Sequence, residues 1–90
     1  MACGRGYKTV QPRALAKLAR EARALAEGRG VNPWAAEPAY DALGYLSDVR
    51  GDVRRGNCDL AKRRLRAVMH KLQAARQRAQ RTGPPPPRRR

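Results

Sequence analysis

Apolar residues recur at three- and four-residue steps in three stretches of the chain, which is the spacing of one face of an α-helix. The first stretch predicts a helix over about residues 12–28. Pro12 suits a first helical turn, where its missing N–H needs no partner, and Gly28 suits the position just past the helix end. The apolar stripe of this helix consists of Leu15, Leu18, Ala22 and Leu25.

The second stretch predicts a helix over about residues 38–55. Asn32 followed by Pro33 is a helix start signal, and Pro38 can restart the helix, so the segment between the prolines can form a separate short turn. We expect Trp34, in that segment, to anchor the loop onto the core. The apolar stripe consists of Ala39, Ala42, Leu43, Leu46, Val49 and Val53.

The third stretch predicts a helix over about residues 58–82. Asn57 is suited to cap this helix, and Asp59 places a negative charge in its first turn, where the helix dipole favours one. Gly83 and the four prolines that follow cannot continue it. The apolar stripe steps by four and three residues and consists of Ala61, Leu65, Val68, Leu72, Ala75 and Ala79.

These patterns predict an all-α fold of three helices in a single domain over residues 11–82. Residues 1–10 carry no pattern and are expected to be flexible, and residues 83–90 should form a disordered tail rich in proline and arginine. The chain has 90 residues and no phenylalanine, and a domain of this size buries only about 60% of the surface of its unfolded chain. We therefore expect homodimerisation to complete the helical bundle.

The two cysteines, Cys3 and Cys58, lack the spacing of a zinc site and have no histidine partners nearby. One disulfide between them is possible, but we expect free thiols in a reducing compartment. No apolar run approaches the roughly 20 residues of a membrane span, and the first ten residues lack the apolar region of a secretory signal. The sequence thus predicts an intracellular protein, cytoplasmic, with the nucleus as the alternative.

Positive charge is concentrated in two parts of the chain, and the net charge is +14. Residues 1–29 carry seven basic and two acidic side chains, residues 30–56 carry three and four, and residues 57–90 carry eleven and one. Self-repulsion on this scale destabilises a compact state unless a polyanion neutralises it. The first and third helices and the tail are therefore candidates for binding nucleic acid.

Basic and amide side chains occupy the side of the third helix opposite its apolar stripe. A solvated helix face usually mixes glutamate with lysine in stabilising pairs, and here the glutamates are missing. The core of this row is Arg63, Arg66, His70, Gln73, Gln77 and Arg81, and Lys62, Arg64, Lys71 and Arg78 widen it. On the first helix, Arg13, Lys17 and Arg20 form a second row. We expect both rows to bind a polyanion.

Residue types narrow the choice of polyanion. Proteins that bind single strands stack bases on aromatic side chains, and the third helix has none. Arginine, which pairs with phosphate through two parallel hydrogen bonds, outnumbers lysine 17 to 4. A long, uniform row suits phosphate contacts better than base reading, and A-form RNA is bound mainly by shape. The prediction is sequence-independent binding of double-stranded RNA.

The segment "VRRGNCDLAKRRL" lies in a layout of long helices, an arginine-bearing face and a proline-containing tail. Over about residues 33–82 this layout resembles the helical double-stranded-RNA-binding silencing suppressors of small insect viruses, the nodavirus type. The resemblance implies a viral protein that acts as a suppressor of RNA silencing. It would be a homodimeric helical bundle that coats duplex RNA and hides it from processing. No diagnostic motif carries the resemblance, so it assigns no residue.

Two alternatives remain open: a small phage or viral regulator that binds an acidic host protein surface, and a DNA-binding regulatory protein. Membrane-surface binding is disfavoured because the apolar side of the third helix is partly alanine. His70 is the only histidine and has no second ligand for a metal. We find no serine nucleophile, carboxylate pair or glycine-rich phosphate loop, and therefore expect a protein that is not an enzyme and takes no cofactor, metal or small-molecule substrate.

Overall fold

The computed structural model describes residues 3–81, which form a short 3₁₀-helix followed by three α-helices. No strand occurs in this part of the chain, so the predicted all-α class with three helices is confirmed. None of the described helices is long and apolar enough to cross a bilayer. The elements are η1 (Arg5–Val10), α1 (Pro12–Glu27), α2 (Pro33–Arg54) and α3 (Cys58–Gln80).

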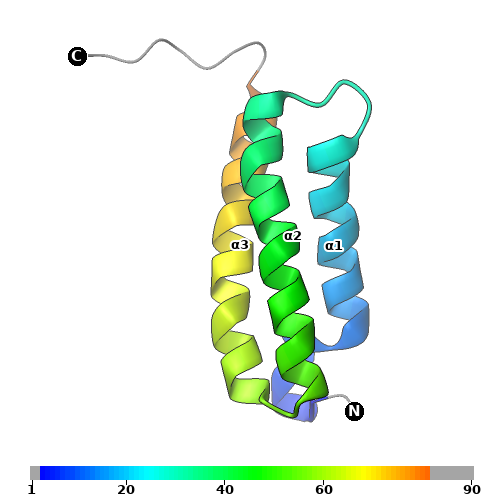
Figure 1. Cartoon of the computed structure of the whole chain (residues 1–90), viewed down its shortest axis with the longest axis vertical. Helices are drawn as coiled ribbons and strands as arrows, with labels where there is room; N and C mark the ends of the chain where they lie inside the picture. The colour runs from blue at the N-terminus through cyan, green and yellow to red at the C-terminus, as the bar shows by residue number, and fades with distance from the viewer. Residues whose placement is uncertain (1–2, 82–90) are drawn as a thin grey trace, which may run out of the picture.

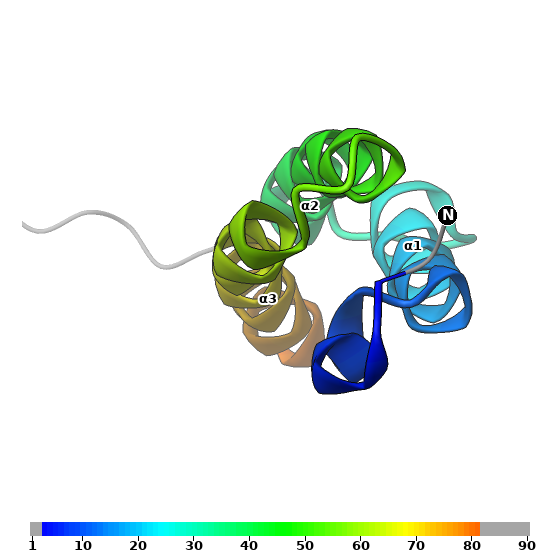
Figure 2. The ribbon, with the colours of Figure 1, turned by 90° about the horizontal axis from the view of Figure 1, so that it is seen from below.

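Helix α2 lies between α1 and α3 and packs extensively against both (Figure 1). Helices α1 and α3 touch each other much less. Seen from the end of the bundle, η1 closes the side between α3 and α1 that α2 does not cover (Figure 2). The outward faces of α1 and α3 therefore lie on opposite flanks of the molecule.

The core lies where the three apolar stripes meet. The predicted stripes of α2 and α3 are confirmed, apart from a half-buried Leu43 and an exposed Ala79 at the end of α3. On α1 the buried line is shifted, because Leu18 and Leu25 lie at its edge and are only partly buried. The fully buried positions of α1 are Leu15, Ala19, Ala22 and Ala26.

A single chain covers these stripes. Leu65 and Leu72, at the centre of the α3 stripe, are 6% and 0% exposed without any second copy. The stripes therefore need no cover from a second copy, and the homodimer stays a prediction.

Helix α2 begins at Pro33, five residues before the predicted start. Its cap is Asn32, whose side-chain oxygen accepts a hydrogen bond from the backbone N–H of Trp34 at 2.9 Å. Pro38 lies inside the helix and cannot donate to the Trp34 carbonyl one turn earlier. That carbonyl instead accepts a hydrogen bond from Nη1 of Arg78 on α3, at 2.9 Å. The side chain from α3 thus replaces the bond that proline removes, and the helix continues through it.

Residues 3–10, which belong to the segment expected to be flexible, pack onto the bundle. Val10 at the end of η1 is fully buried, and Gln11 donates through Nε2 to the carbonyl of Cys3 at 2.6 Å. Cys3 forms a disulfide with Cys58, with 5.9 Å between their Cα atoms. This finding corrects the expectation of free thiols. The intracellular location stays a prediction, but the thiol argument no longer supports it, because disulfides persist mainly in oxidising environments.

The α2–α3 connection is a tight turn. Gly56 has a φ of 78°, which glycine adopts without strain, and the N–H of Asn57 bonds back to the Asp52 carbonyl at 2.8 Å. The side chain of Asn57 makes no cap hydrogen bond, contrary to the expectation. Helix α3 ends at Gln80, two residues before the predicted end. The predicted tail, residues 83–90, lies outside the described residues.

Candidate nucleic-acid interface

The side of α3 that points away from the core carries five exposed side chains. We call this set the outer face of α3. Within residues 3–81, neither arginine of the outer face forms an ion pair. Five of the predicted site residues are thus brought together on one exposed surface. They are Arg63, Arg66, His70, Gln73 and Gln77.

Other cations of α3 face α2 and are neutralised there. Each pairs with a carboxylate of α2, and the order along the two helices is antiparallel. Lys71 and Arg78, predicted to bind nucleic acid, each pair with an acid of α2 in this structure, and their role in binding stays a prediction. The pairs, with their N···O distances, are Glu37–Arg78 at 3.5 Å, Asp41–Lys71 at 3.2 Å and Asp52–Arg64 at 3.3 Å.

These ion pairs could have been predicted from the spacing of the acids on α2, which counting charges by region did not reveal. The four acids of α2 are separated by four, seven and four residues, a spacing that places them on one side of a helix. A helix with such a row predicts cations on the helix packed beside it. The acids are Glu37, Asp41, Asp48 and Asp52.

Asp52 is the buried member of that row, with 1% of its surface exposed. Its Oδ1 atom lies 3.4 Å from Nη2 of Arg55. Nη1 of Arg64 donates a hydrogen bond to the same Oδ1 atom at 3.4 Å. The same Nη1 lies 3.3 Å from Oδ2, which itself accepts no hydrogen bond. A buried carboxylate with two cations beside it fixes the end of α2 against the start of α3.

Lys62 and Arg81, at the two ends of the predicted row, contact aromatic rings. Lys62 lies 5.6 Å from the centre of the Tyr7 ring and donates to the Gly6 carbonyl at 3.4 Å. Arg81 lies 5.6 Å from the ring centre of Trp34. Neither cation has a carboxylate partner among the described residues, so both can still contact a polyanion at the edges of the outer face.

Trp34 and Tyr7 fix opposite ends of α3. Arg78 also stacks over Trp34, at 4.9 Å from the ring centre, so the expected anchoring role of this tryptophan is directed at α3. The Tyr7 hydroxyl donates to Asp59 at 2.6 Å. This hydrogen bond, followed by the charge of Asp59, raises the pKa of Tyr7 above its ordinary value. Residues outside the three predicted helices thus take part in positioning α3.

A bidentate ion pair joins α1 to α3 and was not expected from the sequence. The Arg76 guanidinium donates through Nε and Nη2 to the two carboxylate oxygens of Glu21, the second bond measuring 2.7 Å. Hydrogen bonding from Arg76 lowers the pKa of Glu21, and the charges of Arg76 and Lys17 lower it further, against an opposing effect of burial. Arg76 therefore links α3 to α1 within the bundle. Its partner lies 55 residues away, so spacing along the sequence could not have identified it.

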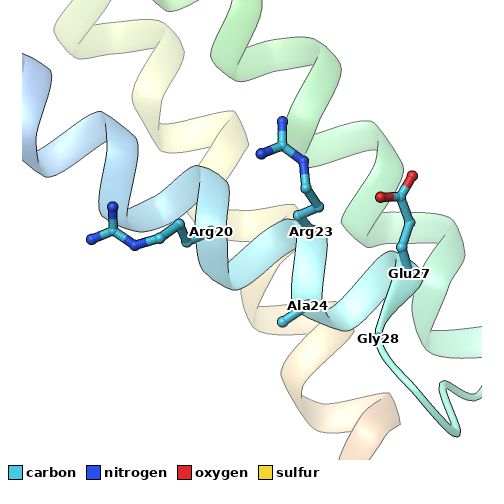
Figure 3. Close-up of a pocket in the computed structure, with 5 residues that line it drawn as sticks. All are labelled: Arg20, Arg23, Ala24, Glu27 and Gly28. Atoms are coloured by element: carbon cyan, nitrogen blue, oxygen red, sulfur yellow. The ribbon is translucent and has the colours of Figure 1, made fainter.

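The second predicted row lies on α1. Arg13, Lys17 and Arg20 are exposed on α1. Lys17 is the member of this row closest to α3, because its charge acts on Glu21, which pairs with Arg76 of α3. A shallow hollow of about 410 Å³ is formed at the end of α1. There the guanidinium groups of Arg20 and Arg23 point in different directions (Figure 3). The hollow therefore does not gather cations around one anion.

A groove runs between α3 and η1, at the edge of the outer face. Its volume is about 370 Å³. It includes three of the five outer-face side chains, so the cationic surface adjoins the apolar side chains of Leu65 and Met69. The lining residues are Thr9, Lys62, Leu65, Arg66, Met69, His70 and Gln73.

No cluster of residues suited to hold a metal ion occurs in the part of the chain that the structure describes. Comparison with protein families, with curated proteins and with solved structures finds no match for this chain. The resemblance to the nodavirus-type suppressors therefore stays a prediction, and any function must be argued from the surface itself.

Proposed function

We propose that the protein binds double-stranded RNA, independently of sequence, through the outer face of α3. The observation that carries this proposal is the division of charge on one helix. Cations on the side facing α2 are matched by carboxylates, whereas Arg63 and Arg66 on the outward side are not. Structural ion pairing therefore explains only part of the positive charge of α3.

The chemistry of the outer face suits a nucleic-acid backbone. From Arg63 to Gln77 it extends over 14 residue steps, or about 21 Å at 1.5 Å per residue. Arginine forks pair with phosphate oxygens through two hydrogen bonds. The amides of Gln73 and Gln77 both donate and accept, as a ribose 2′-hydroxyl does, so they complement RNA better than DNA.

The same surface gives a physical basis for a role in suppressing RNA silencing. A protein that contacts backbone and 2′-hydroxyl groups can cover any duplex and hide it from processing enzymes. Homodimerisation would double the number of contacts along one duplex, and it belongs to this proposal as a separate, testable part. The row on α1 would then contact a second strand or a second duplex.

The decisive experiment removes the two unpaired arginines. In the variant Arg63→Ala/Arg66→Ala, we expect unchanged helicity, because both residues are exposed and alanine is the better helix former. Affinity for two RNA duplexes of unrelated sequence should fall equally, by about 1–3 kcal/mol per lost contact. Fluorescence anisotropy of labelled duplexes measures this directly. Wild-type affinity should also fall steeply with added salt, because counterions are released on binding.

The matched control is Arg50→Ala/Arg54→Ala, which removes the same charge from exposed positions of α2. Equal losses in both double variants would mean that total charge alone attracts RNA, and would refute a defined site on α3. Loss of one duplex only would indicate base reading. A preference for DNA, or binding to an acidic protein with no RNA affinity, would support the corresponding alternative.

A further inference from the structure

The groove between α3 and η1 combines an apolar floor with a polar rim. Met69 lies within it and is 39% exposed, one of three large hydrophobic residues exposed in the described part of the chain. Leu65 beneath it is almost fully buried. The volume of about 370 Å³ is within the roughly 300–1,000 Å³ of clefts that hold small ligands. A flat apolar group of a ligand that packed on Met69 would therefore be shielded from solvent.

The rim carries two kinds of polar group. Lys62 and Arg66 are cations without a carboxylate partner among residues 3–81, so they favour an anion. Thr9, His70 and Gln73 are side chains that form hydrogen bonds without a fixed negative charge. A nucleotide has matching parts: a flat base, hydrogen-bonding base edges and a phosphate.

We infer that this groove binds one unpaired nucleotide of a bound RNA duplex, with its base over Met69 and its phosphate at Arg66 and Lys62. The inference rests on the proposed function, because Arg66 belongs both to the groove and to the outer face of α3. A strand held along that face would carry an extruded base directly into the groove. The methionine sulfur and methyl group contact aromatic rings favourably, and so supply the stacking surface that α3 otherwise lacks.

If the groove binds an unpaired nucleotide, the protein should bind more tightly at duplex ends and bulges than along fully paired RNA. A fully paired base is stacked inside the helix and cannot reach Met69, whereas a bulged or overhanging base is already unstacked at little cost. The groove thus adds a structural preference, for unpaired positions, to binding that otherwise ignores sequence.

The test compares three RNA duplexes of equal length: fully paired, with one bulged nucleotide, and with an abasic residue at the bulge. We expect the wild type to bind the bulged duplex about 3- to 10-fold more tightly than the paired one. The abasic duplex should bind like the paired one, because it has the backbone distortion without the base. Met69→Ala should abolish the preference and leave affinity for the paired duplex unchanged. Tyr45→Ala, at a residue 38% exposed on α2, is the matched control and should keep the preference.

The outcomes separate this inference from the proposed function. Equal wild-type affinity for paired and bulged duplexes refutes the groove site and leaves duplex binding intact. No binding to any duplex refutes the proposed function. A preference that survives in Met69→Ala, or that the abasic duplex shares, places the effect elsewhere and overturns the inference. Reduced affinity of Met69→Ala for all three duplexes to the same extent also overturns it, because Met69 would then belong to the general surface.

Discussion

Reducing the Cys3–Cys58 disulfide should destabilise the bundle strongly. The bond joins residues 55 apart in sequence and so restricts a large part of the unfolded chain. For a loop of this length, chain entropy predicts a contribution of about 4 kcal/mol at 25 °C. A loss of that size would lower the melting temperature of a domain this small by roughly 15–30 °C. The perturbation also frees η1, whose buried Val10 contributes to the core.

Urea unfolding with and without a reducing agent measures this contribution. Trp34 is the only tryptophan and stacks under Arg78 between α2 and α3, so its fluorescence reports the separation of these helices. The variant Cys3→Ser/Cys58→Ser should match the reduced wild type and should not respond to the reducing agent. That control separates loss of the bond from other effects of the reagent.

The reasoning fails if the reduced protein unfolds within about 1 kcal/mol of the oxidised one, because chain entropy would then not be the dominant effect. An intermediate loss, accompanied by exchange of amide hydrogens confined to η1, would show that the N-terminal segment detaches alone. In that case the bond stabilises η1 and not the unfolding equilibrium of the whole bundle.

Two further changes test the ion pairs. Asp52→Ala should lower the free energy of unfolding by about 1–3 kcal/mol in urea titrations, because charge-assisted contacts are lost while the half-exposed Arg64 regains water. Asp48→Ala, at an exposed position, should change the free energy of unfolding little. Equal effects of the two variants would contradict a special role for the buried carboxylate. Because Arg76 lowers the pKa of Glu21 below its ordinary 4.5, this pair should stabilise the fold above that pH and lose its effect as the pH falls through the lowered pKa. Glu21→Gln should remove this part of the acid sensitivity, and identical acid-unfolding curves for variant and wild type would contradict it.

The helices of this protein could be predicted because their signals are local. The stripes of α2 and α3 follow from spacing alone, and the structure buries nearly all of their members. Helix α2 was predicted to start too late because Pro38 removes a hydrogen bond, and the sequence around it gives no sign that Arg78 replaces that bond. The compensating donor comes from another helix, so only the assembled bundle reveals it.

The candidate site was predicted in part for the same reason. Helical periodicity identified the outward side of α3, and Arg63 and Arg66 are exposed there without ion pairs. Periodicity alone could not separate Lys71 from the outward side chains of α3. In the structure, Lys71 forms an ion pair with Asp41 across the α2–α3 interface. That distinction depends on the register between two helices. The contribution of η1 to the groove was missed because its short 3₁₀ turn has no periodic apolar pattern.

The disulfide also divides the chain mechanically. Cys3 and Cys58 close a covalent ring that contains η1, α1 and α2, and α3 extends from that ring as a single arm. A force applied to the two ends of the chain passes through the sulfur atoms and bypasses the ring. Among the described elements, only α3 can then lengthen, by roughly 45 Å as its 23 residues go from helical rise to an extended chain. The element that carries the proposed RNA-binding surface is therefore the one that tension can peel away while the rest stays closed.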